Sequence, residues 1–132
     1  MKSKILILTA VALSIGAIFT GSDAMAAKQP KLVAAKFHAD WCGSCKAMGD
    51  AIIDLSNKFD GKEVLFVTFD RTNTTTRHHS ELLASAMDLD KVYDGNEGTG
   101  YVLLIDAESG EVIEKMKGMT AKEMGNTIAG KL

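Results

Sequence analysis

The most reactive side chains in this sequence belong to its two cysteines, Cys42 and Cys45. Only two residues separate them, so a bridge between them closes a very short loop. Because the entropic stabilisation from a disulfide grows with the loop that it closes, this pair is poorly placed as a structural staple. The close C-x-x-C spacing instead suits redox chemistry, in which the same two sulfurs alternate between dithiol and disulfide.

Metal binding is a second chemistry for the same pair. Thiolates and imidazoles suit Cu(I) and Zn(II), and His38 precedes the first cysteine by four residues. Cys42, Cys45 and His38 therefore form an alternative ligand set, although two cysteines alone do not close a site. Side chains of adjacent helical residues point about 100° apart, so His78 and His79 are expected on the surface without sharing an ion.

The segments on either side of the cysteines have the patterns of a strand and a helix. Residues 31–37 (KLVAAKF) are an apolar segment of strand length, which is expected to form a central strand. Residues 40–44 interrupt this apolar run. A helix is predicted to begin near Cys42, because apolar side chains then recur on one helical face. They are Met48, Ile52, Leu55 and Phe59.

Further strand patterns follow along the chain. Residues 64–69 (VLFVTF) form a continuous apolar run, which is typical of a strand buried on both faces. Residues 101–106 (YVLLID) predict another buried strand after a long loop over residues 88–100. Residues 111–117 follow a Ser109-Gly110 turn and are predicted to form an antiparallel edge strand.

Two more helices complete the pattern. The second is expected to bury Leu82, Leu83, Ala86 and Met87. A closing helix is predicted after Thr120 and Glu123, which have the spacing of a capping box. Its expected inner stripe is Ala121, Met124, Ile128 and Leu132. The order strand, helix, strand, helix, strand, strand, helix predicts an α/β fold with a mixed central sheet and helices on both faces.

The N-terminal residues 1–26 are predicted to be a secretory signal peptide. Lys2 and Lys4 precede an apolar run, and small residues surround a cleavage point after Ala26. Cleavage there leaves one domain, residues 27–132, which is expected to be periplasmic or secreted, where disulfides persist. The alternative is an uncleaved N-terminal anchor, and it is the only membrane contact that the sequence suggests.

Composition and charge argue against nucleic-acid binding. The 132 residues carry 15 basic and 17 acidic side chains, giving a formal net charge of −2. The lysines are scattered along the chain, so no basic field is available to attract phosphate groups.

The segment from Phe37 to Lys46, FHADWCGSCK, resembles the active-site segment of the thioredoxin superfamily. The order of predicted elements is also similar to that family over nearly all of residues 27–132. The resemblance implies a thioredoxin fold (βαβαββα) and a thiol:disulfide oxidoreductase with no cofactor beyond its own redox-active disulfide. Its expected partners are protein thiols and disulfides and a further redox partner, and the protein is expected to be a monomer.

The two cysteines are expected to have different roles. Cys42 falls at a helix start, where free N–H groups and the positive end of the dipole favour a thiolate, so it is the expected nucleophile. Cys45 lies one turn further on and is expected to resolve the mixed disulfide. The reduction potential of the pair sets the direction of electron flow. A third interpretation, a fold retained for protein interaction only, is disfavoured by the intact WCGSCK segment.

The immediate neighbours of the cysteines are also expected to matter. Trp41 is predicted on the exposed rim, where its flat ring can rest against a partner chain. Gly43 and Ser44 stand where thioredoxins themselves have glycine and proline, which alters the local rigidity. His38 replaces an aromatic residue that thioredoxins carry at that position.

Two further positions depart from the family pattern. Lys36 stands where thioredoxins usually have a buried carboxylate that helps to move the resolving cysteine's proton. Its charged head is expected either to reach solvent or to stabilise a thiolate. Thr99 and Gly100 stand where the family has a cis-proline, and they are expected to form a strand-edge platform for a bound peptide. A trans peptide bond is expected at Gly100, because cis bonds before residues other than proline are costly.

Overall fold

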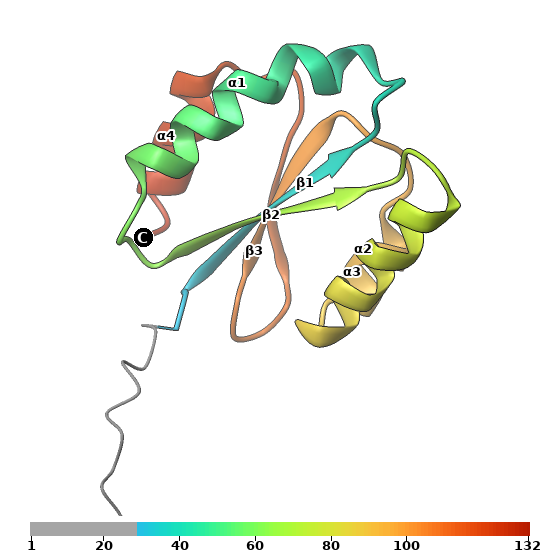
Figure 1. Cartoon of the computed structure of the whole chain (residues 1–132). Helices are drawn as coiled ribbons and strands as arrows, with labels where there is room; N and C mark the ends of the chain where they lie inside the picture. Colours follow the sequence, from blue (N-terminus) through green and yellow to red (C-terminus); the bar gives the residue numbers. More distant parts are fainter. Residues whose placement is uncertain (1–28) are drawn as a thin grey trace, which may run out of the picture.

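The structure is a computed structural model, and it describes residues 29–132. In this part of the chain, four strands form one mixed sheet in the order β2-β1-β3-β4, with helices on both faces (Figure 1). The strands are β1 (Leu32–His38), β2 (Val64–Asp70), β3 (Tyr101–Asp106) and β4 (Val112–Met116). The helices are α1 (Gly43–Lys58), α2 (Thr74–Ala86), α3 (Asp90–Gly95) and α4 (Ala121–Ala129). The predicted α/β fold is confirmed.

The predicted signal peptide, residues 1–26, lies outside the described residues. Among residues 29–132, no helix has the length and the apolar character that crossing a membrane requires.

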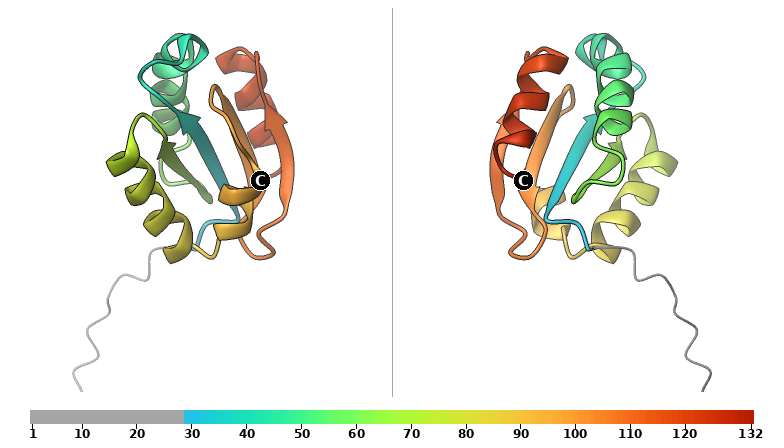
Figure 2. Two further views of the ribbon diagram at one scale, coloured as in Figure 1. Left: turned by 90° about the vertical axis from the view of Figure 1, so that its right-hand side faces the viewer. Right: turned by 90° about the vertical axis from the view of Figure 1, so that its left-hand side faces the viewer.

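Strand β1 is a central strand of the sheet, as its apolar sequence predicts. It pairs in parallel with β2, where His38 lies opposite Asp70, and antiparallel with β3, where Phe37 lies opposite Tyr101. Strand β4 pairs antiparallel with β3 at the edge of the sheet, also as predicted. Figure 2 shows β1 running from the end of the molecule where the described chain begins to the opposite end, where α1 starts. The strand therefore delivers the C-x-x-C segment to one end of the sheet.

Alternate side chains of β1 enter two separate apolar cores. Leu32 and Ala34 pack with residues of α1 and α4, whereas Val33, Ala35 and Phe37 pack with residues of α2 and α3. Figure 1 shows these two pairs of helices on opposite sides of the sheet. Because side chains alternate along a strand, the even-numbered residues of β1 share the face that α1 covers.

Helices α1 and α4 bury most of the stripes that the sequence predicts. In α1, Met48 and Leu55 are buried and Ile52 is half-buried. In α4, Met124 and Ile128 are buried, and the capping box of Thr120 and Glu123 is present. Leu132 was expected in this stripe, but it follows the helix end and is exposed.

Helix α2 buries a different face from the one expected. Ser80 and Ala84 face the sheet, while Leu82 is 58% exposed. The reason is a pair of hydrogen bonds, because Ser80 Oγ accepts from the Asp70 N–H at 2.7 Å and donates to the Asp70 carbonyl at 3.0 Å. These bonds turn a face of small residues toward β2. The prediction is wrong for Leu82, Leu83 and Ala86, which are exposed, and Met87 is half-buried.

Two further predictions need correction. Strand β2 is not buried on both faces, since Leu65 is 42% exposed and only Val64 and Phe69 are buried. It is the edge strand on its side of the sheet, so solvent reaches it despite its apolar sequence. The predicted loop over residues 88–100 also contains the short helix α3, which buries Val92 and Tyr93.

Candidate active site

The first turn of α1 is capped by the sulfur of Cys42. The backbone of Cys42 is extended (φ −89°, ψ 113°), and the N–H of Cys45 donates to Cys42 Sγ at 3.2 Å. No acidic side chain lies in this first turn. The sulfur therefore occupies the place of an N-cap oxygen, where the N–H group and the positive end of the helix dipole stabilise negative charge.

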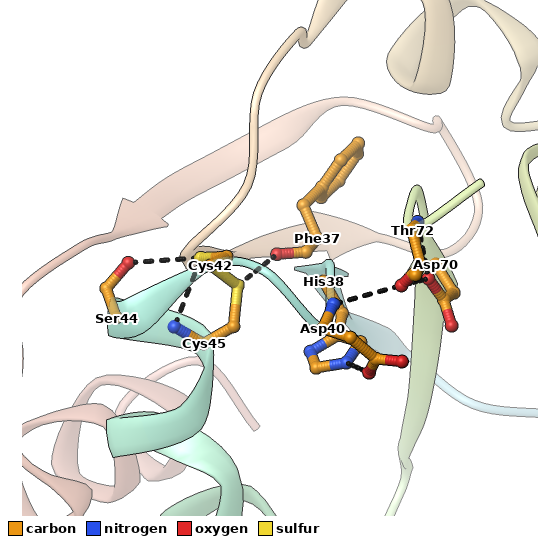
Figure 3. Close-up of a disulfide and its surroundings, with 8 residues drawn as sticks. All are labelled: Phe37, His38, Asp40, Cys42, Ser44, Cys45, Asp70 and Thr72. Atoms are coloured by element: carbon orange, nitrogen blue, oxygen red, sulfur yellow. Dashed lines mark hydrogen bonds and ion pairs between the residues drawn. A yellow bond between two sulfur atoms is a disulfide. The ribbon is translucent and has the colours of Figure 1, made fainter.

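Cys42 and Cys45 form a disulfide, which Figure 3 shows at the start of the helix. Their Cα atoms are 5.2 Å apart. Cys42 is 8% exposed, whereas Cys45, in the first turn of α1, is fully buried. This difference favours Cys42 as the sulfur that a partner reaches first.

The two residues between the cysteines differ in their contacts. Ser44 Oγ lies 3.3 Å from Cys42 Sγ, within hydrogen-bond distance for sulfur. Gly43 has open space around it, because an added Cβ would meet no atom within 4 Å. Ser44, at the position where thioredoxins have proline, thus brings a hydroxyl donor to the sulfur.

Gly100 brings the start of β3 against the disulfide. Its N–H donates to the Phe37 carbonyl at 2.8 Å, and its φ is +85°. A Cβ at Gly100 would collide with Ser44 Oγ and lie 3.3 Å from Cys42 Sγ. Both the left-handed backbone and the close approach therefore require glycine. Residues 29–132 contain no cis peptide bond, so the bond at Gly100 is trans, as expected.

Two hollows are lined by residues that neighbour the cysteines in the sequence or in space. One, of about 310 Å³, is lined by Ser44, Gly100 and Met119, so it opens between the starts of α1 and α4. The other, of about 430 Å³, is lined by Trp41 and Thr99 among others. The expected platform residues Thr99 and Gly100 therefore each border one of the two hollows.

Trp41 lies on the exposed rim, as predicted. Its side chain is 64% exposed, and its Nε1–H donates to the Thr72 carbonyl at 3.3 Å. This single bond orients the ring while leaving most of it available for contact with a partner.

A polar network ties the end of β1 to the end of β2 (Figure 3). His38 Nε2 lies 3.1 Å from Asp40 Oδ1, and the Asp40 N–H donates to Thr72 Oγ1 at 3.0 Å. The Thr72 N–H and hydroxyl donate to Asp70 Oδ1 at 2.8 and 2.6 Å. Burial by itself raises the pKa of Asp70, but the hydrogen bonds from Thr72 and the charge of His38 outweigh it, so the pKa lies below its ordinary value.

Asp70, Arg71 and Thr72 belong to this region, and sequence reasoning missed them. The Arg71 guanidinium stacks 5.0 Å from the centre of the Phe37 ring and 4.4 Å from that of Tyr93. It also donates to the Tyr93 carbonyl at 2.7 Å. The available signal was the run of polar residues directly after the β2 sequence, at the sheet end where β1 also ends.

Lys36 is the buried basic residue of β1. It is 8% exposed and, as an even-numbered residue, it shares the sheet face that α1 covers. Burial lowers the pKa of its ammonium group, because the charged form loses solvation.

The alternative metal set does not gather in the structure. Within residues 29–132, no group of three or more His, Cys, Asp or Glu side chains is arranged to hold an ion. His38 is instead engaged with Asp40, and the exposed His78 pairs with Glu81 at 3.6 Å.

Comparisons with known proteins agree with this fold. The family model described as Thioredoxin matches residues 21–90, more than half of the chain. No curated protein matches the chain. Similar solved structures include the reduced thioredoxin pre-protein of Schistosoma mansoni, at 21% identity and a TM-score of 0.52, covering 80% of this chain and 83% of that chain.

Two other similar structures are thioredoxins as well. Thioredoxin f2 of Chlamydomonas reinhardtii is 21% identical with a TM-score of 0.52, over 79% of this chain and 82% of that chain. A mutant thioredoxin of Halobacterium salinarum is 22% identical with a TM-score of 0.51, over 76% of this chain and 74% of that chain. These structures confirm the thioredoxin fold. The family model, which matches more than half of the chain, shows that the chain belongs to the thioredoxin family.

Proposed function

We propose that this protein is an exported thiol:disulfide oxidoreductase that exchanges its Cys42–Cys45 pair with partner proteins. The observation that carries the proposal is the cap of α1, where the sulfur of Cys42, the more exposed of the two cysteines, accepts the Cys45 N–H. A thiolate in that place is stabilised by the helix start, and thiolates are the nucleophiles of disulfide exchange.

In the reducing direction, the Cys42 thiolate attacks one sulfur of a partner disulfide. The partner S–S bond breaks, and its electron pair leaves on the other partner sulfur, while Cys42 becomes joined to the partner. Cys45 then attacks Cys42 Sγ, forms the internal disulfide and releases the second partner thiol. Two electrons pass from the dithiol to the partner, and the reverse sequence oxidises a partner dithiol.

The surroundings of Cys42 suit a polypeptide partner. Trp41 presents an exposed ring, and the buried Gly100 lets the backbone before β3 approach Ser44 and Cys42 closely. An extended partner segment would pair with the backbone of half-buried Thr99, just before β3, because backbone hydrogen bonds provide binding without a sequence requirement.

Export is the second part of the proposal. It rests on Lys2 and Lys4, the apolar run after them and the small residues before position 27. When all 132 residues are expressed in a bacterial host, the protein should therefore be recovered from the periplasm. Its mass should be lower than that of the full chain by the mass of residues 1–26. Fractionation followed by mass spectrometry of the intact protein checks this, and recovery only of the full-length mass from the membrane fraction would instead favour an uncleaved anchor.

The exchange activity is tested by reduction of insulin disulfides with dithiothreitol as electron donor. The wild-type protein should accelerate insulin precipitation, and Cys42→Ser should fall to the uncatalysed rate. Cys45→Ser should retain the first attack and accumulate a mixed disulfide with insulin, visible on a non-reducing gel. If the wild type gives no acceleration, or if Cys42→Ser is as active as the wild type, the proposal fails.

A further inference from the structure

Within residues 29–132, the sulfur of the resolving cysteine, Cys45, has a hydrogen-bond contact with the Phe37 carbonyl and none with a carboxylate. Cys45 is fully buried, so bulk water does not take the proton directly. At the position where the sequence resemblance predicts a carboxylate, the chain has Lys36. Resolution still requires a Cys45 thiolate, because a thiol is a poor nucleophile.

The position of the Cys45 sulfur narrows the choice of acceptor. Cys45 Sγ lies 3.6 Å from the carbonyl oxygen of Phe37 in β1. The residues on either side of Phe37 are Lys36 and His38, whose side chains share the face of β1 that α1 covers. Successive residues of a strand are about 3.3 Å apart, so the side chains of both residues start close to the sulfur.

The hydrogen bonding of His38 distinguishes it from Lys36. His38 Nε2 lies 3.1 Å from Asp40 Oδ1, and an ionised carboxylate only accepts, so Nε2 carries the hydrogen. In the neutral ring, Nδ1 then holds a lone pair. Nδ1 is buried and has no hydrogen-bond partner among the described residues. Figure 3 shows the ring between the disulfide and the carboxylate of Asp40.

We propose that His38 Nδ1 accepts the proton of Cys45 during resolution of the mixed disulfide, with Asp40 as the positioning residue that fixes the tautomer. This inference rests on the proposed function. The Cys45 S–H proton moves to Nδ1 through one water molecule. The Cys45 sulfur then bonds to Cys42 Sγ, the bond from Cys42 to the partner breaks, and the partner leaves as a thiolate that takes up a proton.

Other charged or titratable groups near His38 also influence its affinity for a proton. Asp40 holds Nε2 from the loop before α1, and Asp70 faces the ring from β2 and interacts with its charge. Lys36 lies two residues away on the same face of β1. The N-cap and the first turn of α1 contribute the two sulfurs. Lys36 is therefore the competing nitrogen base, and it provides the matched control.

The two exchange steps can be timed separately with the aromatic disulfide dithiobis(nitrobenzoate), whose released thiol absorbs visible light. Attack by Cys42 of the reduced protein releases one equivalent, and resolution by Cys45 releases a second. In a stopped-flow instrument, Cys45→Ser identifies the first phase. The second phase is then compared in wild type, His38→Gln, Asp40→Asn and Lys36→Met over a range of pH.

Near neutral pH, His38→Gln is expected to slow the second phase at least about tenfold, within the usual range for general acid–base catalysis, and to leave the first phase unchanged. The loss should shrink as pH rises past the ordinary thiol pKa of about 8.5, because Cys45 then ionises without a base. Recovery at high pH also shows that the variant is folded. Asp40→Asn should give a loss with the same pH dependence, and Lys36→Met should match the wild type.

Three results would overturn the inference. They are an unchanged second phase in His38→Gln, a slowing by the same factor at every pH, and a pH-dependent loss in Lys36→Met instead. Failure of the proposed function looks different, because the wild type itself would then release no second equivalent.

Discussion

The starts of helices α1 and α4 are capped in two different ways. At α4, Thr120 Oγ1 accepts from the Glu123 N–H at 3.3 Å, and the Glu123 carboxylate accepts from the Thr120 N–H at 2.7 Å. At α1, one sulfur, that of Cys42, caps the helix. Helix α2 resembles α4, since its start has a capping box formed by Asn73 and Thr76.

The difference teaches how a helix start is made available for chemistry. In the capping boxes of α2 and α4, backbone N–H groups of the helix start donate to side-chain oxygens. These hydrogen bonds stabilise the helices, but they involve no reactive side chain. At α1 the cap is an atom whose charge changes with redox state, so the same N–H bond that caps the start of the helix also stabilises the reactive thiolate. The absence of acidic side chains from this first turn keeps that positive end unneutralised.

The largest expected effect comes from exchanging the sulfur cap. Cys42→Ser and Cys42→Ala should both abolish insulin reduction, because neither offers a thiolate. Serine is a good N-cap and alanine a poor one, so the alanine variant should be about 1 kcal/mol less stable than the serine variant. Urea unfolding of the two variants measures this difference, and equal stability would show that the residue 42 side chain does not cap α1.

The next largest effect concerns the contact of β3 with the α1 start. Gly100→Ala places a Cβ against Ser44 and Cys42 at a positive φ, so we expect a loss of about 2 kcal/mol in unfolding free energy and slower exchange. Gly43→Ala is the matched control, since its Cβ meets open space. Thermal unfolding and insulin reduction check both variants. Similar behaviour of the two would contradict the close approach at Gly100.

The smallest effect is the pH dependence of the α4 cap. The backbone and hydroxyl of Thr120 donate to Glu123 and lower the pKa of its carboxyl in the folded state. A lowered folded pKa gives stability that is complete above the unfolded value and is lost as pH falls through the folded one. Unfolding followed between neutral pH and about pH 3 should therefore show a weaker decline in Glu123→Gln than in the wild type. An identical decline would argue against this cap.

The sequence predicts the fold well where local patterns decide the outcome. The apolar run of β1 and the Thr120–Glu123 spacing are local signals, and both elements form as expected. The buried face of α2 was missed because it depends on hydrogen bonds between Ser80 and Asp70 on a different element. The apolar pattern of β2 contains no information about its edge position, which the strand order determines.

Some features of the candidate site could likewise be predicted from the sequence, and others could not. The cysteine pair and the approach of Gly100 follow from a local motif and a family resemblance. The contacts of Thr72 with Asp40 and Trp41 join residues that are 32 and 31 positions apart in the chain, so no local spacing announces them. The buried nitrogen of His38 likewise becomes visible only when its hydrogen bonds are placed in space.

The central claim is that Cys42 and Cys45 form a working redox couple, and equilibration with glutathione buffers tests it most directly. The fraction of disulfide, read by alkylation and mass spectrometry, should follow a single reversible two-electron transition that is the same from the reduced and the oxidised side. Cys42→Ser should show no such transition. The absence of a reversible couple in the wild type, together with tight binding of Cu(I) or Zn(II) by the reduced protein, would contradict the claim.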